Sequence, residues 1–138
     1  MIPVSAPWSF RYLDQPIKRI LLIDDDEIFN FVTKRIISRV DPEIIVSSFE
    51  KPEAGYKNLA EVNPDLILLD LNMPHLNGWT FLERMRNDGF DFPVIVLTSS
   101  ILKEDKSKAR EFMNVFGYIS KPIEVKHLNI ILEGEAAV

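Results

Sequence analysis

The chain has 138 residues, enough for one domain with a substantial core and too few for two domains of ordinary size. Its 46% hydrophobic and 27% charged residues are ordinary for a globular protein, and its net charge of −5 argues against a nucleic-acid-binding surface, which is normally basic. There is no cysteine, no apolar run near the roughly 18 residues of a membrane span and no signal-peptide pattern, so we expect a cytoplasmic protein that uses neither disulfides nor thiolate chemistry and binds no membrane.

The first part of the chain predicts an arm, a strand and a helix. Residues 1–17 are rich in proline and aromatic side chains and read as an irregular N-terminal arm. The run at 19–23, which is apolar after Arg19, predicts a buried strand that ends at the three acids of 24–26. A helix is expected to follow and to end before Asp41, because Pro42 disfavours helical backbone at the residue before it. Its apolar face is predicted from residues four positions apart: Ile28, Val32 and Ile36.

The middle of the chain contains the stretch around which the prediction is organised. A strand at 44–46 is followed by a weaker helix over 51–62. Residues 66–69 are a continuous apolar run that is followed by an acid, Asp70, and they predict a strand over 65–70 that is buried on both faces. A loop and a helix over 79–87 follow. The apolar face of that helix is predicted from Phe81, Leu82 and Met85, and Gly89 is expected to end it.

The last part of the chain repeats the alternation of strand and helix. We expect strands at 93–97 and 117–120, a polar helix over 102–115 between them, and a final helix over 124–133. Residues 134–138 form a short tail. The buried face of the final helix is predicted from Val125, Leu128 and Leu132.

Five strands that alternate with five helices predict an α/β fold with a parallel sheet and right-handed crossovers. All strands of such a sheet end at the same edge, where open α/β folds bind their ligands. We therefore expect the polar residues at the strand ends to meet there: Asp24, Asp25, Asp70, Thr98 and Lys121.

These residue types together indicate phosphoryl transfer. Three close carboxylates cannot all remain ionised unaided, and a site of oxygen ligands favours Mg²⁺ or Mn²⁺. Lys121 supplies a positive charge and Thr98 a hydroxyl for phosphate oxygens. In this arrangement Asp70 is the nucleophile and forms an aspartyl phosphate, without a separate base.

Four segments of the chain closely resemble the receiver domain of bacterial two-component response regulators, the CheY-like family. They are residues 20–26, 64–74 with Gly78, 93–99 and 117–122. The resemblance covers residues 18–133. It implies a flavodoxin-like, doubly wound sheet of five parallel strands in the order 2-1-3-4-5, with five helices on two faces.

The resemblance also implies roles for individual residues. Asp70 is the phosphoacceptor, and Asp25 and Asp70 ligate Mg²⁺ directly. Asn72 ligates the ion through its backbone carbonyl and Asp24 through water. The phosphoryl group is contacted by Lys121, Thr98 and the backbone N–H groups of Asn72 and Ser99. Thr98 and Tyr118 act as the switch, and the Lys121–Pro122 bond is typically cis.

The resemblance to a receiver domain implies protein partners, and two alternative functions remain open. The expected partners are a sensor histidine kinase or histidine phosphotransfer protein and an effector that binds the fourth helix, fifth strand and fifth helix, with the chain a stand-alone monomer or weak dimer. One alternative is a haloacid-dehalogenase-type Mg²⁺ phosphatase, because Asp24 and Asp26 form an Asp-x-Asp pattern after a strand. Another is a receiver-like scaffold that signals without phosphorylation.

Overall fold

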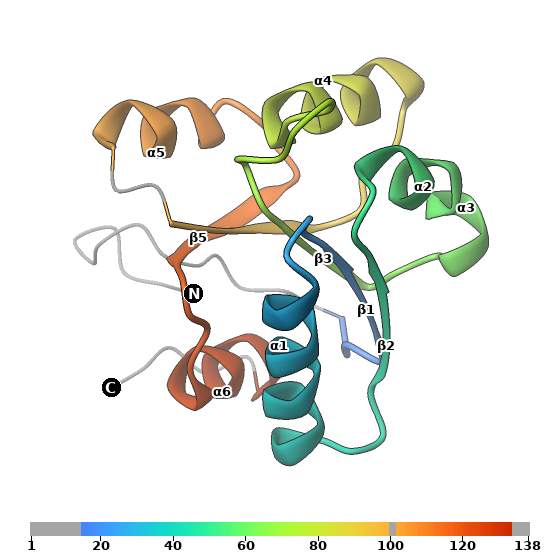
Figure 1. The fold of residues 1–138 in the computed structure, drawn as a ribbon, viewed down its shortest axis with the longest axis vertical. Coiled ribbons are helices and arrows are strands. Elements are labelled where there is room, and N and C mark those ends of the chain that lie inside the picture. Colours follow the sequence, from blue (N-terminus) through green and yellow to red (C-terminus); the bar gives the residue numbers. More distant parts are fainter. Residues whose placement is uncertain (1–14, 100–101, 134–138) are drawn as a thin grey trace.

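The computed structural model of the protein describes residues 15–99 and 102–133. Its described strands form one parallel sheet in the order β2-β1-β3-β4-β5 (Figure 1). This order confirms the predicted topology. The strands are β1 (Arg19–Ile23), β2 (Ile45–Phe49), β3 (Leu66–Leu69), β4 (Val94–Thr98) and β5 (Val115–Ser120).

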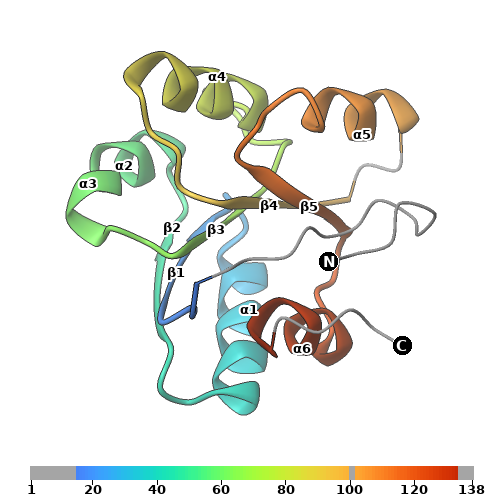
Figure 2. The ribbon, with the colours of Figure 1, turned by 180° about the vertical axis from the view of Figure 1, so that it is seen from behind.

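Helices cover both faces of the sheet (Figures 1 and 2). One face carries α1 (Glu27–Val40) and α6 (Val125–Glu133). The other face carries α2 (Pro52–Lys57), α3 (Leu59–Val62), α4 (Gly78–Asp88) and α5 (Lys103–Ala109). Among the described residues no helix combines the length and apolar character needed to cross a bilayer.

Alternate residues of each central strand enter two separate cores. In β1, Leu21 and Ile23 pack toward α2–α5, whereas Ile20 and Leu22 pack toward α1 and α6. Every residue of β3 and β4 is buried, as expected for strands covered on both faces. The continuous apolar runs in the sequence therefore predicted the strands that form the centre of the sheet.

Side chains and glycine begin and end the helices that follow the site strands. Asp26 caps α1 by accepting a hydrogen bond from the N–H of Phe29 at 3.1 Å. Asn77 caps α4 in the same way, with the N–H of Thr80 at 2.9 Å. Gly89 ends α4 with φ of 80°, a left-handed conformation that glycine adopts easily.

The predicted apolar face of α1 is wrong. Ile28 and Val32 are 76% and 42% exposed, and only Ile36 of the predicted three is partly buried. The helix instead buries Asn30, Thr33 and Ile37. Two of these residues are polar, so a pattern of hydrophobicity could not identify the buried face.

The ends of α6 and β2 also differ from the prediction. Val125 is 49% exposed in the first turn of α6, whereas Leu128 and Ile131 are buried. The edge strand β2 extends to Phe49, which pairs with Ile23 of β1. The prediction stopped at residue 46 because two serines follow, yet an edge strand tolerates polar residues since it is paired on one side only.

Two predicted helices are interrupted. The helix expected over 51–62 is divided at Asn58, whose side-chain amide donates to the carbonyl of Ala54 at 2.7 Å and competes with regular helix bonding. The helix expected over 102–115 ends at Ala109. The carbonyl of Asn114 already accepts the N–H of Val94 at 2.8 Å, so the chain has joined the sheet by that point.

Candidate functional site

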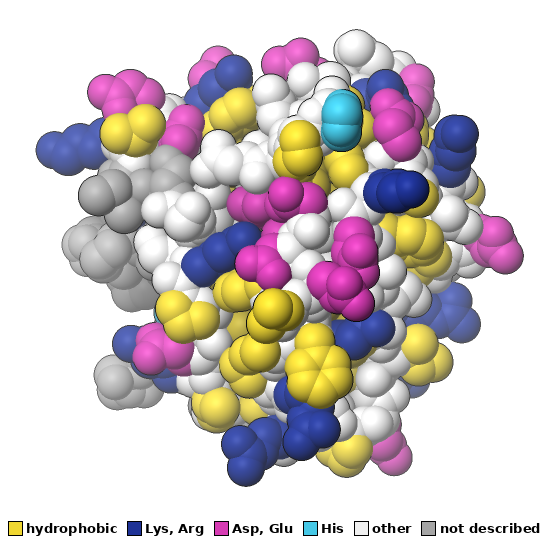
Figure 3. Space-filling model, viewed as in Figure 1, with side chains coloured by type: hydrophobic (Ala, Val, Ile, Leu, Met, Phe, Trp, Pro, Cys, Tyr) yellow, Lys and Arg dark blue, Asp and Glu magenta, His cyan; other side chains and the backbone are white. Residues whose placement is uncertain are grey.

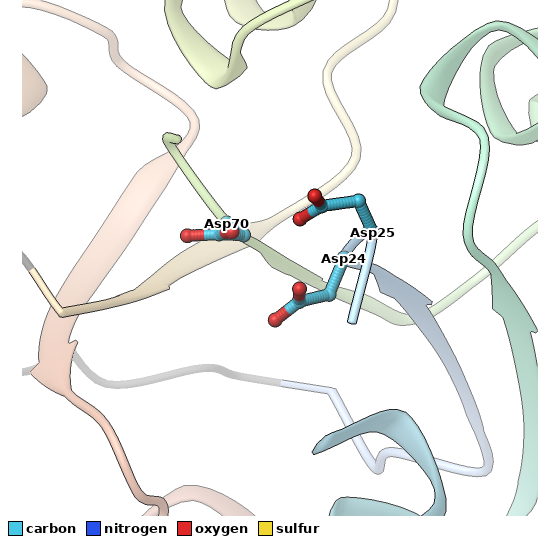
Figure 4. Close-up of side chains that lie close together, drawn as sticks. All are labelled: Asp24, Asp25 and Asp70. Carbon is cyan, nitrogen blue, oxygen red and sulfur yellow. The ribbon is translucent and has the colours of Figure 1, made fainter. Parts of the chain in front are cut away.

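Three carboxylates meet where β1 and β3 end. One oxygen each of Asp24, Asp25 and Asp70 lies within 4.8 Å of the others (Figure 4). Asp24 and Asp70 are 4% exposed, whereas Asp25 faces solvent. Strand pairing explains this arrangement, because Ile23 lies beside Leu69 and the residue after each strand is an acid. Residues 45 positions apart in the chain thus form one acidic cluster.

Lys121 completes the cluster from the end of β5. Its Nζ lies 2.6 Å from Oδ2 of Asp24 and 3.5 Å from Oδ2 of Asp70. The lysine is held in place by its own N–H, which donates to the carbonyl of Thr98 at 2.9 Å, and the bond to Pro122 is cis as expected. Its ammonium also lies 4.2 Å from the centre of the Phe29 ring, a cation–π contact from α1.

The electrostatics of the cluster favour a divalent cation. Burial is the main cause that raises the pKa of Asp24, with hydrogen bonding to Lys121 opposing it. Burial also raises the pKa of Asp70, and the charge of Asp24 adds to the rise. Three carboxylates and one ammonium leave a formal charge of −2 when all are ionised. A divalent ion matches both this charge and the all-oxygen donor set, which suits Mg²⁺ or Mn²⁺.

The other predicted site residues lie around this edge. Thr98 is fully buried at the end of β4, and Ser99 is exposed directly after it. The backbone N–H of Asn72 points to Oδ1 of Asp70 at 3.4 Å. Tyr118 is 3% exposed in the core between the sheet and α2–α5, where Nζ of Lys106 lies 5.7 Å from its ring centre. His75, in the loop after Asp70, is exposed.

A buried asparagine supports the acidic turn and was not identified from the sequence. The side-chain amide of Asn30 donates to the backbone carbonyl of Asp24 at 2.8 Å. The N–H of Asp26 donates to Oδ1 of Asp24 at 3.0 Å, so both parts of Asp24 are held. The signal available was Asn30 itself, a polar residue four positions after the helix cap. Asn30 was missed, as was Phe29, whose ring contacts the ammonium of Lys121, because the predicted buried face of the helix was wrong.

Gly78 allows the loop after Asp70 to close against the strand that carries it. A Cβ at this position would lie 2.6 Å from the backbone oxygen of Asp70 and 2.7 Å from Cα of Leu71. The N–H of Gly78 donates to the carbonyl of Leu71 at 2.9 Å. The 2.6 and 2.7 Å distances from the added Cβ are too short for a side chain, because backbone atoms already occupy the space. The glycine predicted as part of the motif therefore has a steric role beside the phosphoacceptor candidate.

The acids and an apolar patch share one face of the molecule (Figure 3). Acidic side chains with an adjoining lysine or arginine lie near the centre of this view. Hydrophobic side chains adjoin them over α1, where Ile28, Phe31 and Val32 are 76%, 61% and 42% exposed. We call these three residues the α1 patch. Exposed apolar side chains of this size are unusual beside a polar site.

Comparisons with known proteins agree on one family. Residues 20–133 match the sequence profile described as "Response regulator receiver domain". The nitrate/nitrite response regulator protein NarL of Escherichia coli K12 is 34% identical over 118 residues, which are 86% of this chain and 54% of that protein. The probable C4-dicarboxylate response regulator DctR of Halalkalibacterium halodurans is 29% identical over 120 residues, which are 86% of this chain and 51% of that protein. The chain thus spans about half the length of these curated relatives.

A solved structure extends the similarity to three dimensions. The two-component response regulator from Cytophaga hutchinsonii has a TM-score of 0.75 and 31% sequence identity to this chain. The matched region covers 83% of this chain and 93% of that one. The fold of this chain is therefore shared with a solved two-component response regulator.

Proposed function

Because the chain belongs to the family of response-regulator receiver domains, we propose that it is a phosphorylation-activated switch whose phosphoacceptor is Asp70. The observation that carries the proposal is the position of Asp70. It is buried at a strand end, within 4.8 Å of two further carboxylates and 3.5 Å from the ammonium of Lys121. This is the arrangement that phosphoryl transfer onto a carboxylate requires.

In the proposed reaction an oxygen of Asp70 attacks the phosphorus of a phosphohistidine in line. The new bond joins this oxygen to phosphorus, and the electron pair of the broken phosphorus–nitrogen bond leaves with the imidazole of the donor. Lys121 stabilises the negative charge on the phosphoryl oxygens. Backbone N–H groups of Asn72 and Ser99 and the hydroxyl of Thr98 provide further hydrogen-bond donors.

Asp25, Asp70 and the backbone carbonyl of Asn72 are proposed to hold Mg²⁺ directly, with Asp24 acting through water. The ion would supply positive charge that offsets the charges of the acids and of the incoming phosphoryl group. The fit rests on the net charge of −2 and on the all-oxygen donor set described above. Mn²⁺ would serve as a substitute because it favours the same ligands.

The proposed output is a change in the surface built from α5, β5 and α6. These elements correspond to the fourth helix, fifth strand and fifth helix of the sequence analysis, because the predicted second helix is divided in two. Thr98 and Tyr118 are proposed as the switch that links the phosphoryl group to this surface. The effector protein that reads it is a further proposal, as are the monomeric or weakly dimeric state and the cytoplasmic location.

The α1 patch is the surface we propose for the phosphodonor. A histidine must approach Asp70 from the solvent-facing side, so its protein has to contact the side chains that surround the acids. Phe31 and its two neighbours in the patch provide apolar area there. We therefore expect a histidine kinase or phosphotransfer protein to bury these side chains while it transfers its phosphoryl group.

A labelling experiment tests the proposal directly. Acetyl phosphate with Mg²⁺ is expected to phosphorylate the wild-type chain and the control Asp91→Asn, in which an exposed acid is replaced. Asp70→Asn is expected to remain unmodified in the same intact-mass measurement. Equal labelling of Asp70→Asn and wild type would remove Asp70 from its proposed role.

Adding an Asp24→Asn variant and a binding partner to these samples separates the two alternatives. A haloacid-dehalogenase-type phosphatase would hydrolyse p-nitrophenyl phosphate in a manner that depends on Asp24 and not on Asp70. A phosphorylation-independent scaffold would bind its partner equally well before and after phosphorylation. We expect neither result and propose no enzymatic activity apart from self-catalysed phosphotransfer to Asp70 and slow hydrolysis from it.

A further inference from the structure

A small cavity lies behind the acidic cluster, between α1 and the ends of the central strands. Its volume is ≈ 10 Å³ as measured by the space open to the centre of a water-sized sphere. Five of its lining residues are apolar. The polar ones are Asp24, Asn30, Thr33 and Asp70.

Thr33 places an unsatisfied hydroxyl at this cavity. The residue is 1% exposed, and its Oγ1 has no hydrogen-bond partner among the described residues. Oδ2 of Asp24 is the other buried oxygen of this kind, but the ammonium of Lys121 lies 2.6 Å from it. A buried hydroxyl without a partner destabilises the native state, so native proteins usually satisfy such groups.

We propose that the cavity is a binding site for one ordered water molecule that hydrogen-bonds to Oγ1 of Thr33. A water needs about 10–15 Å³ by this measure and two to four polar partners. The cavity has that volume, and Asp24, Asn30 and Asp70 line it beside the threonine. The apolar remainder of the wall leaves too few oxygens to complete the six or more ligands of a metal ion such as Ca²⁺.

The bound water links α1 to the strand end that carries the acids. It places a neutral hydrogen-bond donor on the buried side of the cluster, opposite the solvent-facing side where Asp25 lies. This explains why α1 turns Thr33 inward in place of an aliphatic residue. The inference concerns the resting protein without metal or phosphoryl group, so it stands or falls independently of the proposed phosphorylation.

Crystallography and unfolding of the full chain test the water site. A crystal structure of the metal-free wild type at about 1.5 Å resolution is expected to show a solvent peak at a hydrogen-bonding distance of about 2.7–3.0 Å from Oγ1 of Thr33. Thr33→Ser keeps the hydroxyl and is expected to keep the peak. A wild-type map without the peak overturns the proposal.

Thr33→Val provides a second measurement that needs no crystals. The substitution preserves shape but removes the hydroxyl, so loss of its bond to the water is expected to raise the unfolding equilibrium constant about fivefold. Thr80→Val is the matched control, because Thr80 is also in a helix but is exposed, and we expect a change of less than about twofold. A dry cavity predicts the opposite sign, since Thr33→Val would remove an unsatisfied group and stabilise the protein.

Discussion

Replacing Asp70 with asparagine should stabilise the metal-free protein. The charges around Asp70 give no net attraction of useful size. At an effective dielectric constant of about 20, repulsion from Asp24, which lies within 4.8 Å, is at least about 3.5 kcal/mol, and attraction to Lys121 at 3.5 Å is about 4.7 kcal/mol. Asp25 is exposed, so its repulsion is closer to 1 kcal/mol, the value for bulk water. The free-energy cost of removing the Asp70 carboxylate from water is therefore not offset by the charges around it.

The expected gain follows from that remaining penalty. An asparagine has the same shape and no charge, and its side-chain oxygen can still accept the N–H of Asn72. Lys121 keeps its closer partner, Asp24, at 2.6 Å. We therefore expect Asp70→Asn to raise the free energy of unfolding by about 2 kcal/mol without metal. For a chain of this size the midpoint of thermal unfolding should rise by about 6–10 °C.

Adding Mg²⁺ should make wild type more stable than Asp70→Asn, the reverse of the order expected without metal. At a concentration of about 100 times its dissociation constant, a ligand stabilises the native state by about 2.7 kcal/mol. Wild type should gain this amount, whereas Asp70→Asn lacks one proposed ligand and should gain much less. Calorimetry with and without Mg²⁺ measures both effects, with Asp91→Asn as the exposed control. The reasoning is refuted if Asp70→Asn is less stable than wild type without metal, or if Mg²⁺ stabilises both proteins equally.

The pH dependence of stability tests whether the buried charge of Asp70 destabilises the native state. Burial raises the pKa of Asp70 above its ordinary value of 3.8, so the native state binds the proton more tightly than the unfolded chain does. The ionised carboxylate therefore destabilises the protein above the raised pKa, and this effect disappears below pH 3.8. The stability advantage of Asp70→Asn should be constant above the raised pKa and should shrink as the pH falls from there toward 3.8. An advantage that stayed constant over this range would contradict burial as the cause.

Three further changes are predicted from contacts in the structure. Gly78→Ala should destabilise the protein by about 3 kcal/mol, because the new methyl would meet backbone atoms at 2.6 and 2.7 Å. The control Gly55→Ala should change stability by less than about 1 kcal/mol, because the closest atom to its methyl is the flexible end of a side chain at 2.9 Å. Urea denaturation of both variants compares the two effects. Tyr56→Phe should lower stability by about 1 kcal/mol, since the hydroxyl donates to Asp88 and links α2 to α4, and the same titration detects it. Phe31→Ser should slow phosphotransfer from a histidine kinase about tenfold and leave labelling by acetyl phosphate unchanged, because Phe31 is 61% exposed on the α1 patch; equal slowing of both reactions would contradict a docking role.

The sheet and the acidic cluster could be predicted because strands at the centre of a parallel sheet have a simple pattern. The runs 20–23, 66–69 and 94–97 are apolar throughout, and each is followed by a polar residue at the same edge. Topology then brings these residues together without any knowledge of distances. The pairing of Lys121 with both Asp24 and Asp70 was less accessible, because it depends on the path of the chain between β5 and α6.

The helices were harder because their boundaries and faces depend on contacts outside the helix. Asn58 divides one predicted helix through a side-chain bond that competes with the backbone. The end of α5 is decided by pairing of Asn114 with β4, which spacing within the helix does not reveal. Gly55 lowers the intrinsic helix propensity of this segment, yet it lies in α2 and packs against Ile23 of the neighbouring strand. In each case tertiary structure overrides a local preference.

The error at α1 has a different cause, and it identifies where this domain departs from a simple amphipathic pattern. The helix buries Ile37, as expected of a surface helix, but its N-terminal half exposes Ile28 and Phe31 and buries Asn30 and Thr33, against the expected polarity. Each buried polar residue faces the acidic edge: Asn30 holds the turn of Asp24, and Thr33 lines the cavity behind it. The exposed apolar residues adjoin the same acids from outside. Local rules usually fail where a site imposes its own requirements, and here a single helix supports the acids with one face and offers a partner surface with the other.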